Sequence, residues 1–348
     1  MTVLKTISLS LLLVSGSLSA ALPTPTADQK AALESVSGKK VRVCIFDPVG
    51  ANGPAVGYAK DYMLEARKWG INADVVAFTD ERVAAEELKA GQCDAAAITT
   101  LRTKQFNHFV GSLDAVGGIP DKKHMNMVLQ TLASPRMAPL MRSGLFEVVG
   151  VIPLGGAYVM VRDRRINSIE AAAGKKVAVM EWDRSQAKMV QRLGAQPVAS
   201  DITNFVGKFN NGQVDIIAAP AVAYKPLEIY RGLGNDGGIY RFPLVMLSAA
   251  LIIRHDRFPP DVGQKLREFV VTQIDKAYEF VDREEAAIPA KYWIDLPAHE
   301  KVKYEGMMRE ARIQMTQEGD YDKRMMSLLK RVRCTVKPTA AECTSQEE

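Results

Sequence analysis

The sequence predicts an α/β protein of two lobes, each built on a mostly parallel sheet flanked by helices, with strands that cross between the lobes. Strand-like and helix-like segments alternate over residues 40–99, and the same β-α-β-α-β order returns over 177–218. This alternation is typical of a parallel sheet covered by helices. The two runs therefore predict two similar folding units in one chain.

The two runs also share local sequence at equivalent places. Gly-Lys-Lys-Val opens each run, at 38–41 and at 174–177, and Gly-Gln-x-Asp precedes the third strand of each, at 91–94 and 212–215. Repetition of both motifs in the same order indicates an internal structural repeat. The interval between the motifs is shorter in the second run, which predicts shorter helices there.

The first residues predict export. Residues 1–21 carry Lys5, then an apolar run, then small residues, which is the order of a secretory signal peptide cleaved after Ala20 or Ala21. No later stretch reaches the roughly 18 to 20 apolar residues that a membrane span requires. We therefore expect a secreted chain located in the periplasm.

Length and charge narrow the class of protein. The 348 residues suit about two domains of roughly 150 residues each. The formal net charge of +5 is modest and spread along the chain. Nucleic acid is therefore not expected as a partner, whereas a mildly basic cleft would attract anions.

Four cysteines occur in a chain that we expect to enter an oxidising compartment, where disulfides form. Cys334 and Cys343 flank a short polar segment, and we expect a bond between them that fixes the C-terminal tail. Cys44 and Cys93 lie on or beside predicted strands. They form either a second disulfide or two buried thiols, since geometry decides bonding.

In the first run, strands are expected at 40–46, 74–78 and 94–99. Pro54 suits the first turn of a helix that ends before Gly70. Asp80 is the expected N-cap of a second helix over 81–90.

The middle of the chain should pass from one lobe to the other. We expect a helical stretch over 122–145 and strands at 148–152 and 158–162. The second run should then supply strands at 177–181, 196–199 and 214–218, with helices between them.

The last third should return to the first lobe. We expect a strand over 244–254 and one long helix from Asp261 to Val281, with its apolar residues on one face. The expected organisation is a signal peptide (1–21), lobe I (22–153 plus 243–335), lobe II (154–242) and a C-terminal tail (336–348).

At this level the sequence resembles a type II periplasmic solute-binding protein and is most similar to the TRAP-type extracytoplasmic receptors. The residues that carry the resemblance are the two GKKV segments, the Gly-Gln-x-Asp turns, the stretch 166–179, and Leu251–Arg254 followed by Phe258-Pro259-Pro260 and a long helix. It implies a periplasmic-binding-protein-like fold that captures a small, in this family often anionic, organic solute between its lobes. It also implies hinge closure near 151–157 and 244–248, and delivery to membrane permease subunits by a monomer without a cofactor.

One residue departs from the family pattern. TRAP receptors usually carry, near the end of the GKKV-type strand, an arginine that binds a substrate carboxylate in bidentate fashion, and Ala178 stands there in this chain. Arg102, Arg162 or Arg184 could supply a replacement charge, or each could be a solvated surface arginine.

In open α/β sheets, ligands bind beyond the carboxyl ends of the strands. In lobe I this selects two loops. The first loop, 47–53, could present backbone N–H groups to a ligand at a helix N-terminus, or it could be an ordinary strand-to-helix turn. The second loop, 99–102, offers two hydroxyls and a charge to a ligand, although its threonine could also serve as a helix cap. The candidate ligand-binding residues of these loops are Asp47, Asn52, Gly53, Thr99, Thr100 and Arg102.

In lobe II the loop after the GKKV-type strand takes the equivalent place. Trp182 is the leading candidate, because a tryptophan at a strand end can stack on a flat or apolar ligand, although it could equally be a core residue. Tyr224 belongs to the loop that starts at 219–221, and Tyr158 lines the crossing between the lobes; both tyrosines could equally pack between the lobes. The candidates of this lobe are Glu181, Trp182, Arg184, Ser185, Tyr158 and Tyr224.

Catalytic and metal-binding signals are weak. The four histidines show no metal-ligand spacing, and there is no GxSxG or P-loop motif. We therefore expect no enzyme, and only Asp47, Glu181 and Asp183 are candidates for an acid or base. Besides an enzyme on the same fold, the second alternative to a solute receptor is an envelope accessory protein on that fold, which predicts a cleft filled by side chains.

Overall fold

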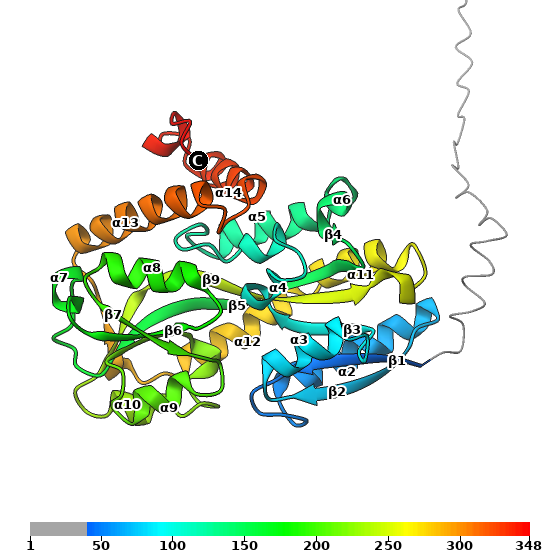
Figure 1. Ribbon diagram of the computed structural model, residues 1–348, viewed down its shortest axis with the longest axis horizontal. Helices are drawn as coiled ribbons and strands as arrows, with labels where there is room; N and C mark the ends of the chain where they lie inside the picture. The colour runs from blue at the N-terminus through cyan, green and yellow to red at the C-terminus, as the bar shows by residue number, and fades with distance from the viewer. Residues whose placement is uncertain (1–39) are drawn as a thin grey trace, which may run out of the picture.

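The computed structural model describes residues 40–348, so the predicted signal peptide lies outside the described residues. Figure 1 shows two lobes side by side, the first in blue and cyan and the second in green. One sheet runs through both lobes in the order β2-β1-β3-β9-β5-β8-β6-β7. The predicted two-lobed α/β fold is thus confirmed, with a single continuous sheet as its frame.

The first lobe holds three parallel strands, β1 (Lys40–Phe46), β2 (Asn72–Phe78) and β3 (Ala95–Thr99). Two helices connect them, α2 (Pro54–Ala66) and α3 (Glu81–Lys89). The expected N-cap forms, since the Asp80 side chain accepts from the backbone N–H of Arg82 at 2.8 Å. The short helix α4 (Thr100–Thr103) follows β3 directly.

The second lobe repeats the arrangement with β6 (Lys176–Met180), β7 (Gln196–Ser200) and β8 (Ile216–Pro220). Its helices α7 (Ile169–Ala172), α8 (Arg184–Arg192), α9 (Phe205–Asn210) and α10 (Tyr230–Leu233) are short. Because α8 and α9 are shorter than α2 and no longer than α3, the prediction from the motif spacing is confirmed.

Two long antiparallel strands join the lobes, β5 (Phe146–Val161) and β9 (Gly238–Arg254). The sequence predicted two separate strands in place of β5, and a β9 that begins at Leu244, and both predictions were wrong. The register shifts at four places along β5, one of them between Pro153 and Gly155. A strand with such irregularities bends without ending, so its sequence resembles two strands with a turn between them.

The expected helical stretch over 122–145 is also corrected. It consists of α5 (Lys122–Ala133), the short α6 (Ala138–Met141) and β4 (Arg142–Ser143), which pairs with the start of β5. The residue after α5, Ser134, is extended because Pro135 follows it.

The long helix predicted from Asp261 is two helices, α11 (Val262–Val271) and α12 (Ile274–Ala286). A short strand, β10 (Trp293–Ile294), then pairs with β9. Both helices pack along β5.

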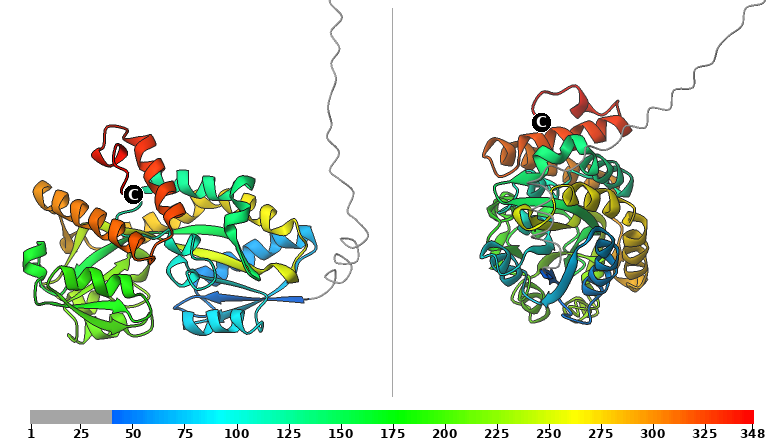
Figure 2. Two further views of the ribbon diagram at one scale, coloured as in Figure 1. Left: turned by 45° about the horizontal axis from the view of Figure 1, so that its top comes forward. Right: turned by 90° about the vertical axis from the view of Figure 1, so that its right-hand side faces the viewer.

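The C-terminal helices α13 (Ala298–Gln317) and α14 (Lys323–Val336) lie over the two lobes in Figure 1 and in the left view of Figure 2. Lys303 of α13 pairs with Glu170, and Asp320, just after α13, pairs with Lys188 of α8. Glu170 and Lys188 belong to the expected second lobe. Helix α14 packs on α5. The C-terminal helices therefore touch both lobes, and the exact lobe boundaries stay a prediction.

Both disulfides form. The predicted bond joins Cys334 and Cys343, with Cα atoms 5.6 Å apart, and the bond that the sequence left open joins Cys44 and Cys93, with Cα atoms 6.0 Å apart. Cys44 lies on β1, and Cys93 precedes the neighbouring strand β3. Within residues 40–348, no helix is long and apolar enough to cross a membrane.

Candidate functional site

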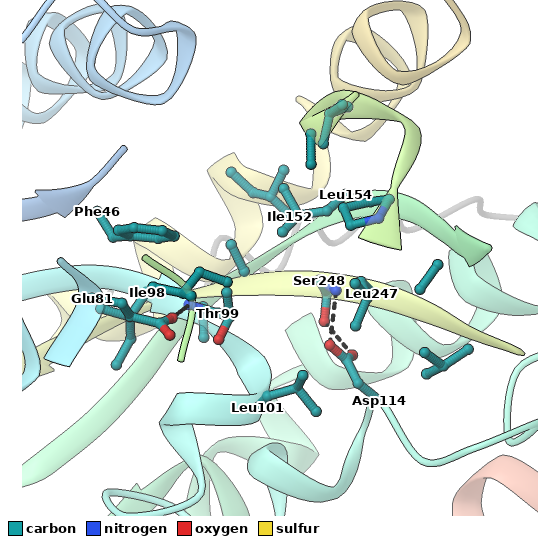
Figure 3. Close-up of a pocket in the computed structure, with 18 of the residues that line it drawn as sticks. Phe46, Glu81, Ile98, Thr99, Leu101, Asp114, Ile152, Leu154, Leu247 and Ser248 are labelled. Carbon is teal, nitrogen blue, oxygen red and sulfur yellow. Dashed lines mark hydrogen bonds between the residues drawn. The ribbon is translucent and has the colours of Figure 1, made fainter. Parts of the chain in front are cut away.

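A cavity of about 400 Å³ lies between the lobes (Figure 3). Its walls come from the carboxyl ends of β1 and β3 and from α2 in the first lobe, from β6, α8 and β8 in the second, and from the crossing strands β5 and β9. This volume falls within the range of small-molecule sites, roughly 300–1,000 Å³. The cavity therefore lies where the strand-end rule predicts it.

Most of the lining side chains are apolar. Aliphatic groups such as Ile98, Ile152, Leu154 and Leu247 surround the space in Figure 3. Aromatic rings come from both lobes and from the C-terminal segment: Phe46, Tyr58, Tyr62, Trp182, Phe205, Phe280 and Tyr321. Such a lining suits a ligand with an apolar carbon skeleton better than a polyhydroxylated ligand such as a sugar.

The first predicted loop is mostly structural. Asp47 lines the cavity, but its carboxylate accepts from the backbone N–H groups of Val49, Ala55 and Val56 and so caps α2. Gly53 lies against it, since an added Cβ would clash with the Asp47 carboxylate. Asn52 is exposed and does not line the cavity.

Of the three candidates in the second predicted loop, Thr99 lines the cavity and Thr100 and Arg102 do not. Thr99 lines the cavity and caps α4 by accepting from the Arg102 N–H. Thr100 is fully buried behind the wall, 2.7 Å from the hydroxyl of Ser248. Arg102 lies outside the lining residues, where its Nε is 3.5 Å from Glu81 Oε2.

In the second lobe, Trp182 and Ser185 line the cavity, whereas Glu181 and Arg184 are exposed outside it. The guanidinium of Arg102 lies 4.3 Å from the ring centroid of Trp182. Because Arg102 belongs to the first lobe, this cation–π contact joins the two lobes at the cavity. Ser185 donates to Asp183, which caps α8.

The two predicted tyrosines lie in the core of the second lobe and do not line the cavity. The Tyr158 hydroxyl donates to Glu285 at 2.8 Å, and its ring packs edge-on against Trp293. Tyr224 packs near Tyr230 and Tyr292. These contacts favour the interpretation of the two tyrosines as packing residues over their interpretation as ligand-binding residues.

Two buried acidic residues that sequence reasoning missed also line the cavity, Glu81 and Asp114 (Figure 3). Burial raises the pKa of Glu81, and hydrogen bonds from Thr99 together with the charge of Arg102 offset part of the rise. Burial raises the pKa of Asp114 to about 7, although two hydrogen bonds from Ser248 favour its ionised form. Glu81 looked like a first-turn helix residue, and Asp114 lies in a turn, so neither carried a motif.

Lys104 is the single basic residue among those that line the cavity in the described chain. Ala178, the residue expected from the resemblance to stand where TRAP receptors carry an arginine, lines the cavity as well, on β6. Of the three arginines considered as replacements, Arg162 bonds the carbonyl of Phe209, Arg184 is exposed and Arg102 is paired.

The acid or base candidates have other tasks or positions. Asp47 and Asp183 cap helices, and Glu181 is exposed. Residues 40–348 contain no cluster of three or more His, Cys, Asp or Glu side chains suited to a metal ion.

Comparison with solved structures shows which known fold the chain shares. A TRAP periplasmic solute binding protein from Desulfovibrio desulfuricans, with bound sn-glycerol-3-phosphate, aligns with a TM-score of 0.71 at 13% identity, over 87% of this chain and 99% of that one. One from Chromohalobacter salexigens, with bound D-glucuronate, aligns with a TM-score of 0.69 at 15% identity, over 84% and 99%.

Comparison with sequences is more specific. The probable solute-binding protein AdeT1 of Acinetobacter baumannii is 48% identical over 304 residues, which are 87% of this chain and 100% of AdeT1. AdeT2 of the same organism is 30% identical over 234 residues, which are 67% of this chain and 98% of AdeT2. The model of the family described as solute-binding protein AdeT 1/2 matches residues 64–348. The chain therefore belongs to the AdeT 1/2 family of solute-binding proteins, and its fold is that of the TRAP-type receptors.

Proposed function

We infer that this protein captures a small organic solute in the cavity between its lobes and delivers it to a membrane transporter. The observation that carries the proposal is the cavity itself, about 400 Å³ in volume and lined by both lobes and by the strands that join them. Export to the periplasm, a monomeric state and a purely binding, non-enzymatic role belong to the same proposal.

The hinge is expected where β5 and β9 cross, near 151–157 and 244–248. A register shift between Pro153 and Gly155 leaves this part of β5 irregular, and Gly155 has a φ of 89°. Closure about this point would enclose the solute, as in other two-lobed binding proteins. The accessory-protein alternative predicted a filled cleft, and the open volume counts against it.

A thermal-shift screen tests the proposal. The protein is unfolded and refolded to remove carried solute, then heated with amines, organic acids, amino acids, sugars and neutral alcohols. A solute at 100 times its Kd stabilises the folded state by about 2.7 kcal/mol.

A variant that fills the cavity supplies the control. Ala178→Phe should abolish every melting-temperature shift, because the new ring occupies the solute space, whereas Ala199→Phe, at an exposed position of β7 outside the cavity lining, should keep the shift. The proposal would be contradicted by melting-temperature shifts that survive Ala178→Phe, or by the absence of a shift with every class of solute.

A further inference from the structure

The charged groups of the cavity are strongly biased in sign. Four of the lining residues are acidic, Asp47, Glu81, Asp114 and Asp183, and one is basic, Lys104. Three of the acids are already compensated. Asp47 and Asp183 cap the positive ends of α2 and α8, and Glu81 pairs with Arg102.

Asp114 is the exception. It is 5% exposed, and within residues 40–348 its hydrogen bonds come from Ser248 alone, with no ion pair. Each carboxylate oxygen accepts one bond and keeps a free lone pair. A buried carboxylate without a cation is costly, and a cationic ligand would remove that cost.

Lys104 does not balance Asp114. It is half-buried, and its Nζ lies 5.3 Å from the centroid of the Tyr321 ring. Charges closer to solvent act through a higher effective dielectric constant, so the field inside the cavity follows the more deeply buried group.

The remaining walls also suit a cation with an apolar body. Aromatic faces attract organic cations, and the cavity is lined by rings such as Phe46, Tyr58 and Phe280. Ala178 of β6 adds a methyl group to the same lining.

We propose that the cavity takes an apolar organic amine, whose protonated nitrogen binds the carboxylate of Asp114 while its hydrophobic body packs against the aromatic and aliphatic walls. This inference rests on the proposed function and adds the chemical class of the solute. The solved neighbours named above carry anionic solutes, whereas the buried charge of this cavity favours the opposite sign.

Isothermal titration calorimetry with three probes of one skeleton tests the inference: 4-phenylbutylamine, 4-phenylbutan-1-ol and 4-phenylbutyrate. The amine should bind about 10-fold or more tightly than the alcohol, because a hydrogen bond between an ammonium group and a carboxylate is stronger than one between a neutral hydroxyl and the same carboxylate. The carboxylate should bind most weakly.

Two variants locate the charge. Asp114→Asn should weaken the amine by about 10-fold while changing the alcohol by less than about 3-fold, so alcohol binding doubles as the check that the variant is folded. Lys104→Met should tighten the amine, because it removes a repelling charge. An amine affinity insensitive to Asp114→Asn, or a carboxylate that binds best and is lost in Lys104→Met, would overturn the inference.

Proton release gives an independent readout. Near pH 7 the free Asp114 is partly protonated, and an ammonium group beside it favours ionisation, so amine binding should release a fraction of a proton. Titration in buffers of different ionisation heat measures this fraction, which should vanish in Asp114→Asn. The other titratable groups lining the cavity, namely Asp47, Glu81, Lys104, Asp183 and the tyrosines, remain in that variant. Release that persists in it would contradict the assignment to Asp114.

The outcomes separate the two proposals. If anionic or neutral solutes shift the melting temperature and the amine does not bind, the solute-binding function stands and the amine inference fails. If no solute of any class binds, the proposed function itself fails.

Discussion

Asp114 holds the crossing strand β9 through a single residue, Ser248. The Ser248 hydroxyl donates to Oδ1 at 2.6 Å, and its backbone N–H donates to Oδ2 at 2.9 Å. Ser248 is also opposite Pro153 of β5 in the sheet register. The carboxylate that lines the cavity is therefore attached directly to the segment expected to act as the hinge.

The raised pKa of Asp114 predicts a pH-dependent stability. Its ordinary value is 3.8 and its value in the fold is about 7, so between these values the folded state binds more protons than the unfolded one. Stability from this group therefore falls as pH rises from about 4 to 7. Urea unfolding should show the stability of wild type relative to Asp114→Asn dropping by roughly 1–4 kcal/mol across this range, at about 1.4 kcal/mol per pKa unit. A pH-independent difference would contradict it.

The contact between Trp182 and Arg102 should favour the closed arrangement of the lobes. Trp182→Ala removes a cation–π contact worth about 1–2 kcal/mol, whereas Trp182→Phe keeps an aromatic face. Small-angle scattering of the solute-free protein should give a larger radius of gyration for the alanine variant and a smaller change for the phenylalanine variant. Equal profiles for wild type and Trp182→Ala would show that the contact does not bias the lobes.

The two disulfides should contribute unequally to stability. The Cys44–Cys93 bond spans 49 residues and the Cys334–Cys343 bond spans 9. In the chain-entropy model these loops correspond to about 4 and about 2.5 kcal/mol. Chemical denaturation of the two double-alanine variants should therefore show the larger loss for Cys44/Cys93. The reverse order would mean that packing around the sulfurs outweighs the loop effect.

The first turn of α2 should depend on a glycine. In Gly53→Ala the new Cβ would meet the Asp47 carboxylate, which would have to leave the backbone N–H groups that it caps, at a cost of about 1–3 kcal/mol. Gly57→Ala is the matched control, because no atom lies within 4 Å of its added Cβ. That variant should gain roughly 0.5–1 kcal/mol, since glycine is a poor residue inside a helix. Similar melting temperatures for both variants would contradict the role given to Asp47.

The sequence by itself determined the elements and their repetition. Local patterns such as Pro54, the Asp80 cap and the two GKKV segments depend on residues close together in the chain, so they predicted the helices and parallel strands of the two repeats correctly, and with them the two lobes. The spacing of nine residues likewise predicted the bond between Cys334 and Cys343. Local patterns failed where tertiary contacts keep an irregular strand paired, as along β5, or where one apolar face is shared by two helices, as in α11 and α12.

Only the tertiary structure decided which side chains face the cavity. Asp114 and Ser248 are 134 residues apart, and the ring of Trp182 meets Arg102 across the lobes. Glu181 and Arg184 stand beside Trp182 in sequence and yet are exposed. Sheet order and register bring distant segments together, and the direction of each side chain follows from that packing, because a polar residue in a turn or at a helix start has the same local pattern whether it meets solvent or a buried cavity.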